Sequence, residues 1–252
     1  MSTQNGFTQN ADLYRNSQAH AELEDLDIAL EHLPSPGGLM TLDVATGTGH
    51  TAFHLARKQA HVFAVDINSE MLRVAQEESD RQTLGVRFLK GSAEDLNFDD
   101  NGFDLVTCRL AAHHFEDVAK FLEECWRVLR PNGHLLLIDN VVPTEPSTAQ
   151  WINEFEKRRD PSHRRCLSEA EWKEQLSDSG FTLCHSEEYR KKLLYGPWME
   201  RMSHQGEVQD ELWEFLENSS EQVRKHLKPR RDKDGKLSLR LTRQILVAQK
   251  KS

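Results

Sequence analysis

Residues 42–50 read Leu-Asp-Val-Ala-Thr-Gly-Thr-Gly-His, and this stretch decides how the chain folds. The apolar run from Leu39 to Ala45 predicts a buried β-strand, and the residues that follow predict a helix from about His50 to Lys58. Glycines at such a junction allow a tight turn and a close approach by a ligand, because they carry no Cβ. The unpaired N–H groups at the start of the helix favour a negatively charged ligand group.

Outward from this turn, short apolar runs alternate with amphipathic stretches, which is typical of βαβ units around a buried parallel sheet. The predicted strands span residues 39–45, 62–66, 86–90, 103–108, 133–139, 181–189 and 241–249. Further helices are predicted from the N-cap Ser69, over residues 118–129, from Ser147, and from the capping box that begins at Ser168 up to Gly180. We therefore expect an α/β protein with a doubly wound, mostly parallel sheet.

The composition limits the classes of function. The 252 residues carry a net charge of −9, which repels phosphate backbones, so we expect no nucleic-acid partner. The basic cluster between Arg224 and Lys236 lacks interleaved aromatic residues for base stacking and is interpreted as a solvated loop. The densest apolar run, Leu135 to Ile138, is too short to span a membrane. The first residues lack the features of a signal peptide, so we expect a cytoplasmic protein.

The four cysteines, Cys108, Cys125, Cys166 and Cys184, lie far apart in the sequence. This spacing predicts buried free thiols in a reducing compartment, and neither a zinc site nor a disulfide framework. We expect no metal. The oligomeric state stays open, a homodimer included.

Asp66 ends the predicted second strand, which is otherwise apolar from Val62. A carboxylate at this place accepts hydrogen bonds from ribose hydroxyls, so Asp66 and the glycine turn together indicate an adenosine-type cofactor. Residues 47–52 also satisfy the pattern G-x-G-x-x-A, which leaves a nicotinamide dinucleotide open. Asp43 favours a cofactor with an ammonium group, because it would repel a pyrophosphate.

Together these residues resemble the class I S-adenosylmethionine-dependent methyltransferases, especially the quinone-biosynthesis-methylase-like branch. Residues 42–49 are similar to the first family motif, D-x-G-x-G-x-G, with Ala45 in place of the first glycine. The other similar stretches, in family order, are residues 62–66, 91–96, 103–109 and 130–134. The resemblance implies a Rossmann-like sheet of seven strands, with an antiparallel terminal strand inserted beside the sixth.

The resemblance further implies S-adenosyl-L-methionine as the cofactor. Asp66 would bind its ribose, and Ser92-Ala93 correspond to a family Asp-Ala pair that recognises adenine, although Ser92 departs from that Asp. For Arg109 two roles stay open: its backbone carbonyl contacts the cofactor, or its side chain orients an anionic acceptor. The residues implied at the cofactor are Asp43, Ala45, Gly47, Gly49, Asp66, Ile67, Ser92, Ala93 and Arg109.

The sequence is expected to form one methyltransferase domain over residues 1–252, with an N-terminal helical segment at 1–38 and a cofactor-binding core at 39–140. Helical lid insertions are expected at 141–180 and 190–240. Apolar residues between Val208 and Leu227 predict one long amphipathic helix within the second insertion.

Methyl transfer from a sulfonium depends mainly on alignment and desolvation, but the acceptor can still need a base. His113 and His114 follow the fourth strand, at the edge of the sheet where ligands bind, and are the catalytic candidates. Packing is the alternative for either of them. Tyr14 and His20 are expected in the substrate pocket, with an exposed helical face as the alternative. Residues 158–165 are expected to form a solvated loop, with substrate binding as the alternative.

We therefore expect methyl transfer to a small-molecule acceptor. Two alternatives stay open: a nicotinamide-dependent oxidoreductase and a non-catalytic adenosyl-ligand-binding protein of the same fold. The first lacks a Tyr-x-x-x-Lys set, since Leu193 and Met199 stand four residues after Tyr189 and Tyr195. A tRNA or protein methyltransferase is disfavoured by the acidic charge balance.

Overall fold

A computed structural model describes residues 22–202 and 204–251. Tyr14 and His20 lie outside these described residues. The chain builds a central sheet with the strand order β3-β2-β1-β4-β5-β8-β6, and β7 pairs with β8 outside this path. The strands are β1 (Met40–Val44), β2 (His61–Asp66), β3 (Arg87–Lys90), β4 (Phe103–Arg109), β5 (Leu129–Asn140), β6 (Phe181–Leu194), β7 (Arg230–Arg231) and β8 (Leu237–Lys250).

Strands β1 to β5 are parallel, and β8 runs antiparallel between β5 and β6. This arrangement confirms the predicted doubly wound sheet with an inserted antiparallel strand. All seven predicted strands are present, but β6 and β8 extend beyond their predicted bounds. The extended ends pair with each other as far as Leu194 and Ser238, which forms a two-stranded extension of the sheet.

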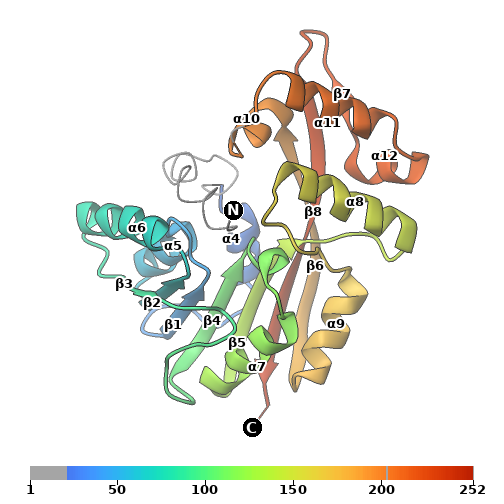
Figure 1. Cartoon of the computed structure of the whole chain (residues 1–252). Helices are drawn as coiled ribbons and strands as arrows, with labels where there is room; N and C mark the ends of the chain where they lie inside the picture. Colours follow the sequence, from blue (N-terminus) through green and yellow to red (C-terminus); the bar gives the residue numbers. More distant parts are fainter. Residues whose placement is uncertain (1–21, 203, 252) are drawn as a thin grey trace.

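Helices cover both faces of the sheet (Figure 1). One buried cluster packs α7 and α9 against the strands, and a second packs α4, α5 and α6 against the opposite face. The described helices are α4 (Glu24–Leu30), α5 (His50–Arg57), α6 (Ser69–Gln82), the 3₁₀ turn η1 (Ala112–His114), α7 (Val118–Val128), α8 (Pro146–Arg159), α9 (Glu169–Asp178), α10 (Tyr195–Glu200), α11 (Glu207–Glu217) and α12 (Glu221–Leu227). Among the described residues, no helix is both long and apolar enough to cross a membrane.

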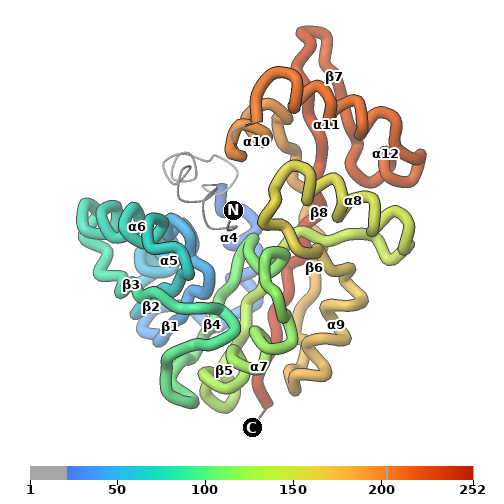
Figure 2. Tube along the Cα trace, in the orientation of Figure 1, coloured from blue at the N-terminus to red at the C-terminus, as the bar shows by residue number. Residues whose placement is uncertain are grey.

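A third buried cluster joins α8, α10, α11 and α12 to the extended ends of β6 and β8. Figure 2 shows that α10, α11 and α12 gather at one end of the molecule, away from α5 and α6. Tyr195, Trp198 and Trp213 are buried in this cluster, and their rings lie against one another. The aromatic side chains of this region therefore pack a core of their own.

Two predicted helix caps are wrong by one or two residues. Asn68, not Ser69, caps α6, because its side chain accepts hydrogen bonds from the backbone N–H groups of Glu70 and Met71. Glu145, not Ser147, caps α8, and Pro146 takes the first helical position, where its missing N–H costs nothing. The capping box that begins at Ser168 is confirmed.

The prediction of one long helix over residues 208–227 is also wrong. α11 ends at Glu217, and Ser220 caps a separate helix, α12, by accepting a hydrogen bond from the backbone N–H of Val223. Local side-chain capping at Ser220 here overrides the continuous apolar spacing. The cysteine prediction needs one correction as well: Cys108, Cys125 and Cys166 are buried free thiols, but Cys184 is exposed.

Candidate functional site

A cavity of about 360 Å³ opens at the carboxyl ends of β1, β2, β4 and β5. Its size lies within the usual range for a small-molecule site. Of the residues implied at the cofactor, the cavity is lined by Ala45, Gly47, Asp66, Ile67, Ser92, Ala93 and Arg109. Both catalytic candidates, His113 and His114, line it as well. The fold therefore brings the glycine turn and the two histidines to one cavity.

The glycine turn is built from three residues with positive φ: Ala45 at 54°, Gly47 at 55° and Gly49 at 89°. An added Cβ at Gly47 would meet nothing within 4 Å, whereas one at Gly49 would lie 2.6 Å from Cζ of Phe53. Gly47 therefore keeps the cavity wall open, and Gly49 allows α5 to pack closely against the turn. Ala45 adopts the left-handed conformation that costs an L-residue roughly 1–2 kcal/mol.

Asp66 closes the far side of the turn. Its carboxylate accepts hydrogen bonds from the backbone N–H of Gly47 at 2.8 Å and of Asn68 at 2.8 Å. Burial raises the pKa of Asp66 above its ordinary value, and these backbone hydrogen bonds oppose the shift. These bonds hold the carboxylate at the end of β2, on the cavity wall. A carboxylate at such a position can accept hydrogen bonds from ribose hydroxyls.

Asp43 lies beneath the turn and is 1% exposed. Its two oxygens accept hydrogen bonds from Thr46 Oγ1 at 2.6 Å and Thr107 Oγ1 at 2.7 Å. Burial raises the pKa of Asp43 to about 6, although both hydroxyls oppose the shift. Asp43 therefore ties β1 to β4 and to the turn, and its predicted contact with an ammonium group stays a prediction.

Ser92 and Ala93 follow β3 and line the cavity. The Ser92 hydroxyl accepts a hydrogen bond from the backbone N–H of Glu94 at 3.2 Å, so it shapes a local turn. Arg109 directs its guanidinium to Asp25 on α4, with Nε and Nη2 at 3.0 and 2.8 Å from Oδ1. The side chain of Arg109 thus connects the end of β4 to the N-terminal helix.

His113 binds Asp139, the carboxylate near the end of β5, through two atoms. Its backbone N–H donates to Oδ2 at 2.8 Å, and its Nδ1 lies 2.6 Å from Oδ1. Burial lowers the pKa of His113, but the carboxylates of Asp139, Glu156 and Asp160 together raise it, so the pKa lies above its ordinary value. Since Nδ1 is bound to Asp139, Nε2 is the ring nitrogen left for an acceptor in the cavity.

His114 has a different environment. Its Nδ1 lies 3.0 Å from Ser162 Oγ, and that hydroxyl donates to Asp160 Oδ1 at 2.5 Å. Burial and the neighbouring His113 lower the pKa of His114 to about 4. The two adjacent imidazoles, whose ring centroids are 4.2 Å apart, therefore have pKa values shifted in opposite directions.

The loop expected to be solvated, residues 158–165, is half buried: residues 159, 160, 162 and 163 are buried, and residues 158, 161, 164 and 165 are exposed. Asp160, Ser162 and His163 are 2%, 8% and 2% exposed. The backbone N–H groups of residues 164 and 165 donate to the carbonyl of His113, and His163 Nε2 lies 2.9 Å from Asn153 Oδ1. These contacts hold the loop on η1. The expectation of a solvated loop, which rested on its many charged residues, is therefore wrong for its buried half.

Several residues at the candidate site were not singled out from the sequence. Asp139 was detectable, because it is an acidic residue near the end of a buried strand, as Asp66 is. No local signal marks the others, which come from distant parts of the chain. They are Asp25, which binds Arg109, and the lining residues Asn140, Arg201 and Arg243.

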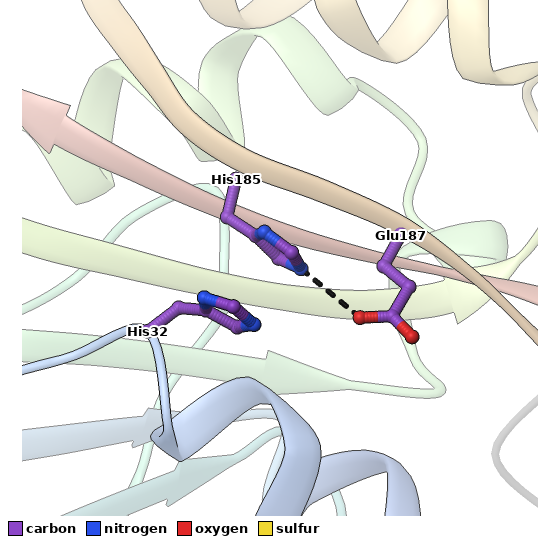
Figure 3. Close-up of side chains that lie close together, drawn as sticks. All are labelled: His32, His185 and Glu187. Atoms are coloured by element: carbon purple, nitrogen blue, oxygen red, sulfur yellow. Dashed lines mark hydrogen bonds and ion pairs between the residues drawn. The ribbon is translucent and has the colours of Figure 1, made fainter.

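A separate group of side chains lies outside the cavity lining. His32, His185 and Glu187 bring their metal-ligand atoms within 4.8 Å of one another (Figure 3). The two imidazole rings stack with centroids 3.4 Å apart and planes at 12°, and His185 Nε2 lies 3.2 Å from Glu187 Oε2. Parallel rings direct their lone pairs side by side and not to one point, so this group is described as a stacked pair bonded to a carboxylate.

Comparisons with known proteins identify the family of the chain. The methyltransferase domain family matches residues 42–137. The chain is 32% identical over 225 residues to an uncharacterized methyltransferase, YcgJ, of Bacillus subtilis, covering 89% of this chain and 89% of the relative. The crystal structure of YcgJ gives a TM-score of 0.84 at 29% identity, over 90% of this chain and 98% of that one.

Two further similarities point the same way. A putative methyltransferase from Bacillus halodurans gives a TM-score of 0.84 at 32% identity, over 90% of this chain and 99% of that one. A demethylmenaquinone methyltransferase of Deinococcus radiodurans is 38% identical over 113 residues, which are 44% of this chain and 45% of the relative. These findings confirm the family resemblance predicted from the motifs.

Proposed function

Because the chain belongs to the methyltransferase family, we propose that it transfers a methyl group from S-adenosylmethionine to a small-molecule acceptor. One observation carries the proposal: the fixed carboxylate of Asp66 lines the same cavity as His113, whose ring is bound to Asp139. Asp66 can accept hydrogen bonds from the ribose of the cofactor, and His113 can accept a proton from the methyl acceptor.

The described residues fit the cofactor. Asp66 would bind the ribose hydroxyls, and Ser92 and Ala93 would lie against the adenine. The open wall at Gly47, where a Cβ would project into empty space, leaves room for the remainder of the cofactor. When bound, S-adenosylmethionine supplies an already activated methyl group, so the protein needs no metal and no covalent nucleophile for this chemistry.

His113 is proposed as the general base. Its Nε2 removes the proton from an acceptor hydroxyl, amine or carbon acid, while Asp139 holds the ring and stabilises the imidazolium that forms. His114 is proposed to position the acceptor, because its lowered pKa keeps it neutral at pH 7. The loop at Asp160 and Ser162 supports this by fixing the His114 ring.

The preference for a small molecule rests on the size of the cavity and on the net charge of −9. An acidic protein attracts polyanions poorly. The relative named for demethylmenaquinone favours the same class of acceptor. The nicotinamide alternative fits less well, because the Asp43 carboxylate beneath the turn disfavours a pyrophosphate.

Transfer of a labelled methyl group tests the proposal. The protein is incubated with methyl-labelled S-adenosylmethionine and a cell extract, and the label is counted separately in small molecules, protein and RNA. We expect label in the small-molecule fraction, above a control without protein, and much less with His113→Ala. Label in the protein or RNA fraction alone would contradict the choice of acceptor.

A further inference from the structure

The outer edge of strand β6 is open. β6 ends the sheet on the side opposite to β3, and β8 is its only strand partner among the described residues. With 14 residues, it is more than twice as long as the usual strand of about 5–6 residues. The backbone N–H and C=O groups of its outer edge therefore have no strand partner within residues 22–202 and 204–251. Such an edge pairs readily with another strand unless its side chains prevent this.

The middle of β6 separates its charges by sign. Residues 187–192 read Glu-Glu-Tyr-Arg-Lys-Lys, so acidic side chains precede the tyrosine and basic side chains follow it. Successive side chains of a strand point to opposite faces of the sheet. Glu188 and Arg190 therefore share one face, where they are 48% and 47% exposed and form an ion pair. Glu187 and Lys191 share the other face. Each face thus carries one acidic and one basic residue at equal distances from the tyrosine.

This order of charges is complementary to itself in an antiparallel arrangement. About a two-fold axis at Tyr189, perpendicular to the sheet, each Glu188 opposes Arg190 of a second copy. Each Glu187 likewise opposes Lys191 of the second copy. A parallel pair in register would instead place like charges opposite each other, which is destabilising. A shift of two residues would place Glu188 or Arg190 opposite itself.

We propose that the chain forms a two-fold homodimer in which residues 186–192 of β6 pair antiparallel with the same residues of a second copy. The two sheets then become one continuous sheet, and four opposed pairs of opposite charge fix its orientation and register. The irregularity between Leu183 and His185 bends the strand and ends the pairing. The interface is self-complementary, so it closes at two copies. This inference does not depend on the proposed function.

The order of the charges favours a second copy over other occupants of the edge. Charged side chains also protect edge strands from pairing, but protection needs no order of sign. A strand of unrelated sequence would oppose Glu188 and Arg190 with unrelated side chains, whereas a second copy supplies both complements. The net charge of −9 opposes general association of the chain with itself. Local complementarity at the centre of β6 is therefore what allows two copies to pair.

The first experiment reverses the acidic charges. Analytical ultracentrifugation of the whole chain at micromolar concentrations should show a dimer. The double variant Glu187→Lys with Glu188→Lys carries only positive charges at the opposed positions, so its dissociation constant should rise about tenfold or more. Glu77→Lys with Asp80→Lys, exposed on α6 beside β3, is the control of equal charge and should stay dimeric. A monomeric wild type, or a double variant that dimerises equally well, would overturn the proposal.

The second experiment mixes variants of opposite sign. Arg190→Glu with Lys191→Glu carries only negative charges at the four opposed positions and should be monomeric by itself. An equal mixture with the first double variant restores opposite charges at every opposed position. We therefore expect a mixed dimer with about the affinity of the wild type. A mixture that stays monomeric, although both variants are folded, would overturn the proposed register.

A cross-link locates the axis without any change of charge. Tyr189 opposes itself in the proposed register, and directly opposed Cα atoms lie about 4.5–5.5 Å apart, which is within the range of a disulfide. In a Cys184→Ser background, Tyr189→Cys should form a covalent dimer under mild oxidation, because Cys184 is the exposed cysteine. Ser177→Cys, exposed on α9, is the matched control and should not. Equal cross-linking of both variants, or of neither, would contradict pairing at this edge.

Discussion

Asp139 accepts two hydrogen bonds from a single residue, His113, at 2.8 Å from its backbone N–H and 2.6 Å from Nδ1. One contact fixes the start of η1, and the other fixes the imidazole ring. A carboxylate or carbonyl often binds one ring nitrogen of a histidine in this way, which sets the tautomer and the ring orientation. The pair is therefore the structural basis of the proposed base.

Asp139→Asn tests the pair. The amide cannot stabilise an imidazolium, so we expect kcat with the identified acceptor to fall about tenfold or more. In the wild type, Asp139 raises the pKa of His113 above its ordinary value, so activity should be lost as the pH falls through this raised pKa. In Asp139→Asn the acidic limb of the pH–rate profile should move to lower pH. An unshifted limb with unchanged kcat would show that His113 is not the base.

Asp43→Asn tests the buried carboxylate through the pH dependence of stability. The pKa of Asp43 is raised by burial to about 6 from 3.8, so its favourable contribution is present below pH 3.8 and is lost as the pH rises through 6. The variant lacks this loss. Its stability relative to the wild type should therefore increase by about 2.5 kcal/mol between pH 4 and pH 8. Urea unfolding at both pH values measures the difference, and a constant difference would refute the shift.

Ala45→Gly tests the strain at the turn. Ala45 has a φ of 54°, where glycine is free of the Cβ clash. Relief of this clash is partly offset by the larger unfolded-state entropy of glycine, so we expect a gain of up to about 1 kcal/mol. Ala56→Gly, within α5, is the control and should lose about 1 kcal/mol. Thermal unfolding compares them, and two losses of equal size would contradict the strain.

Ser92→Asp tests the adenine side of the site. Aspartate preserves the local turn, since it too accepts a hydrogen bond from the backbone N–H of Glu94. It adds an ionised acceptor for the adenine amino group, so the dissociation constant of S-adenosylmethionine should fall about three- to tenfold. Ser177→Asp, exposed on α9, should change nothing. If both variants bind alike, Ser92 does not face the adenine.

The parallel core and the glycine turn were predictable because their signals are local. Each buried strand is a nearly continuous apolar run, and Asp66 stands out as the charged end of one of them. The predicted helix caps were wrong where a neighbouring residue provides the capping side chain instead. Asn68 reaches two backbone N–H groups, which Ser69, inside the helix, does not.

The part of the cavity around Arg243 and residues 158–165 was not predictable, because its residues meet only through long-range topology. Arg243 reaches Asp25 across 218 positions of the sequence, since β8 is inserted between β5 and β6. His163 is buried in spite of its charged neighbours, because Asn153 and the backbone of His113 hold its loop. Such contacts leave no period or spacing in the sequence.

Calorimetric titration of S-adenosylmethionine into the wild type and Asp66→Ala tests the central claim most directly. The account predicts binding at one site by the wild type and about tenfold or greater weakening in Asp66→Ala, because a buried acceptor of ribose hydrogen bonds is lost. Asp80→Ala, near the end of α6, is the control and should bind like the wild type. Equal affinity of all three proteins, or binding of a nicotinamide dinucleotide in place of S-adenosylmethionine, would contradict the account.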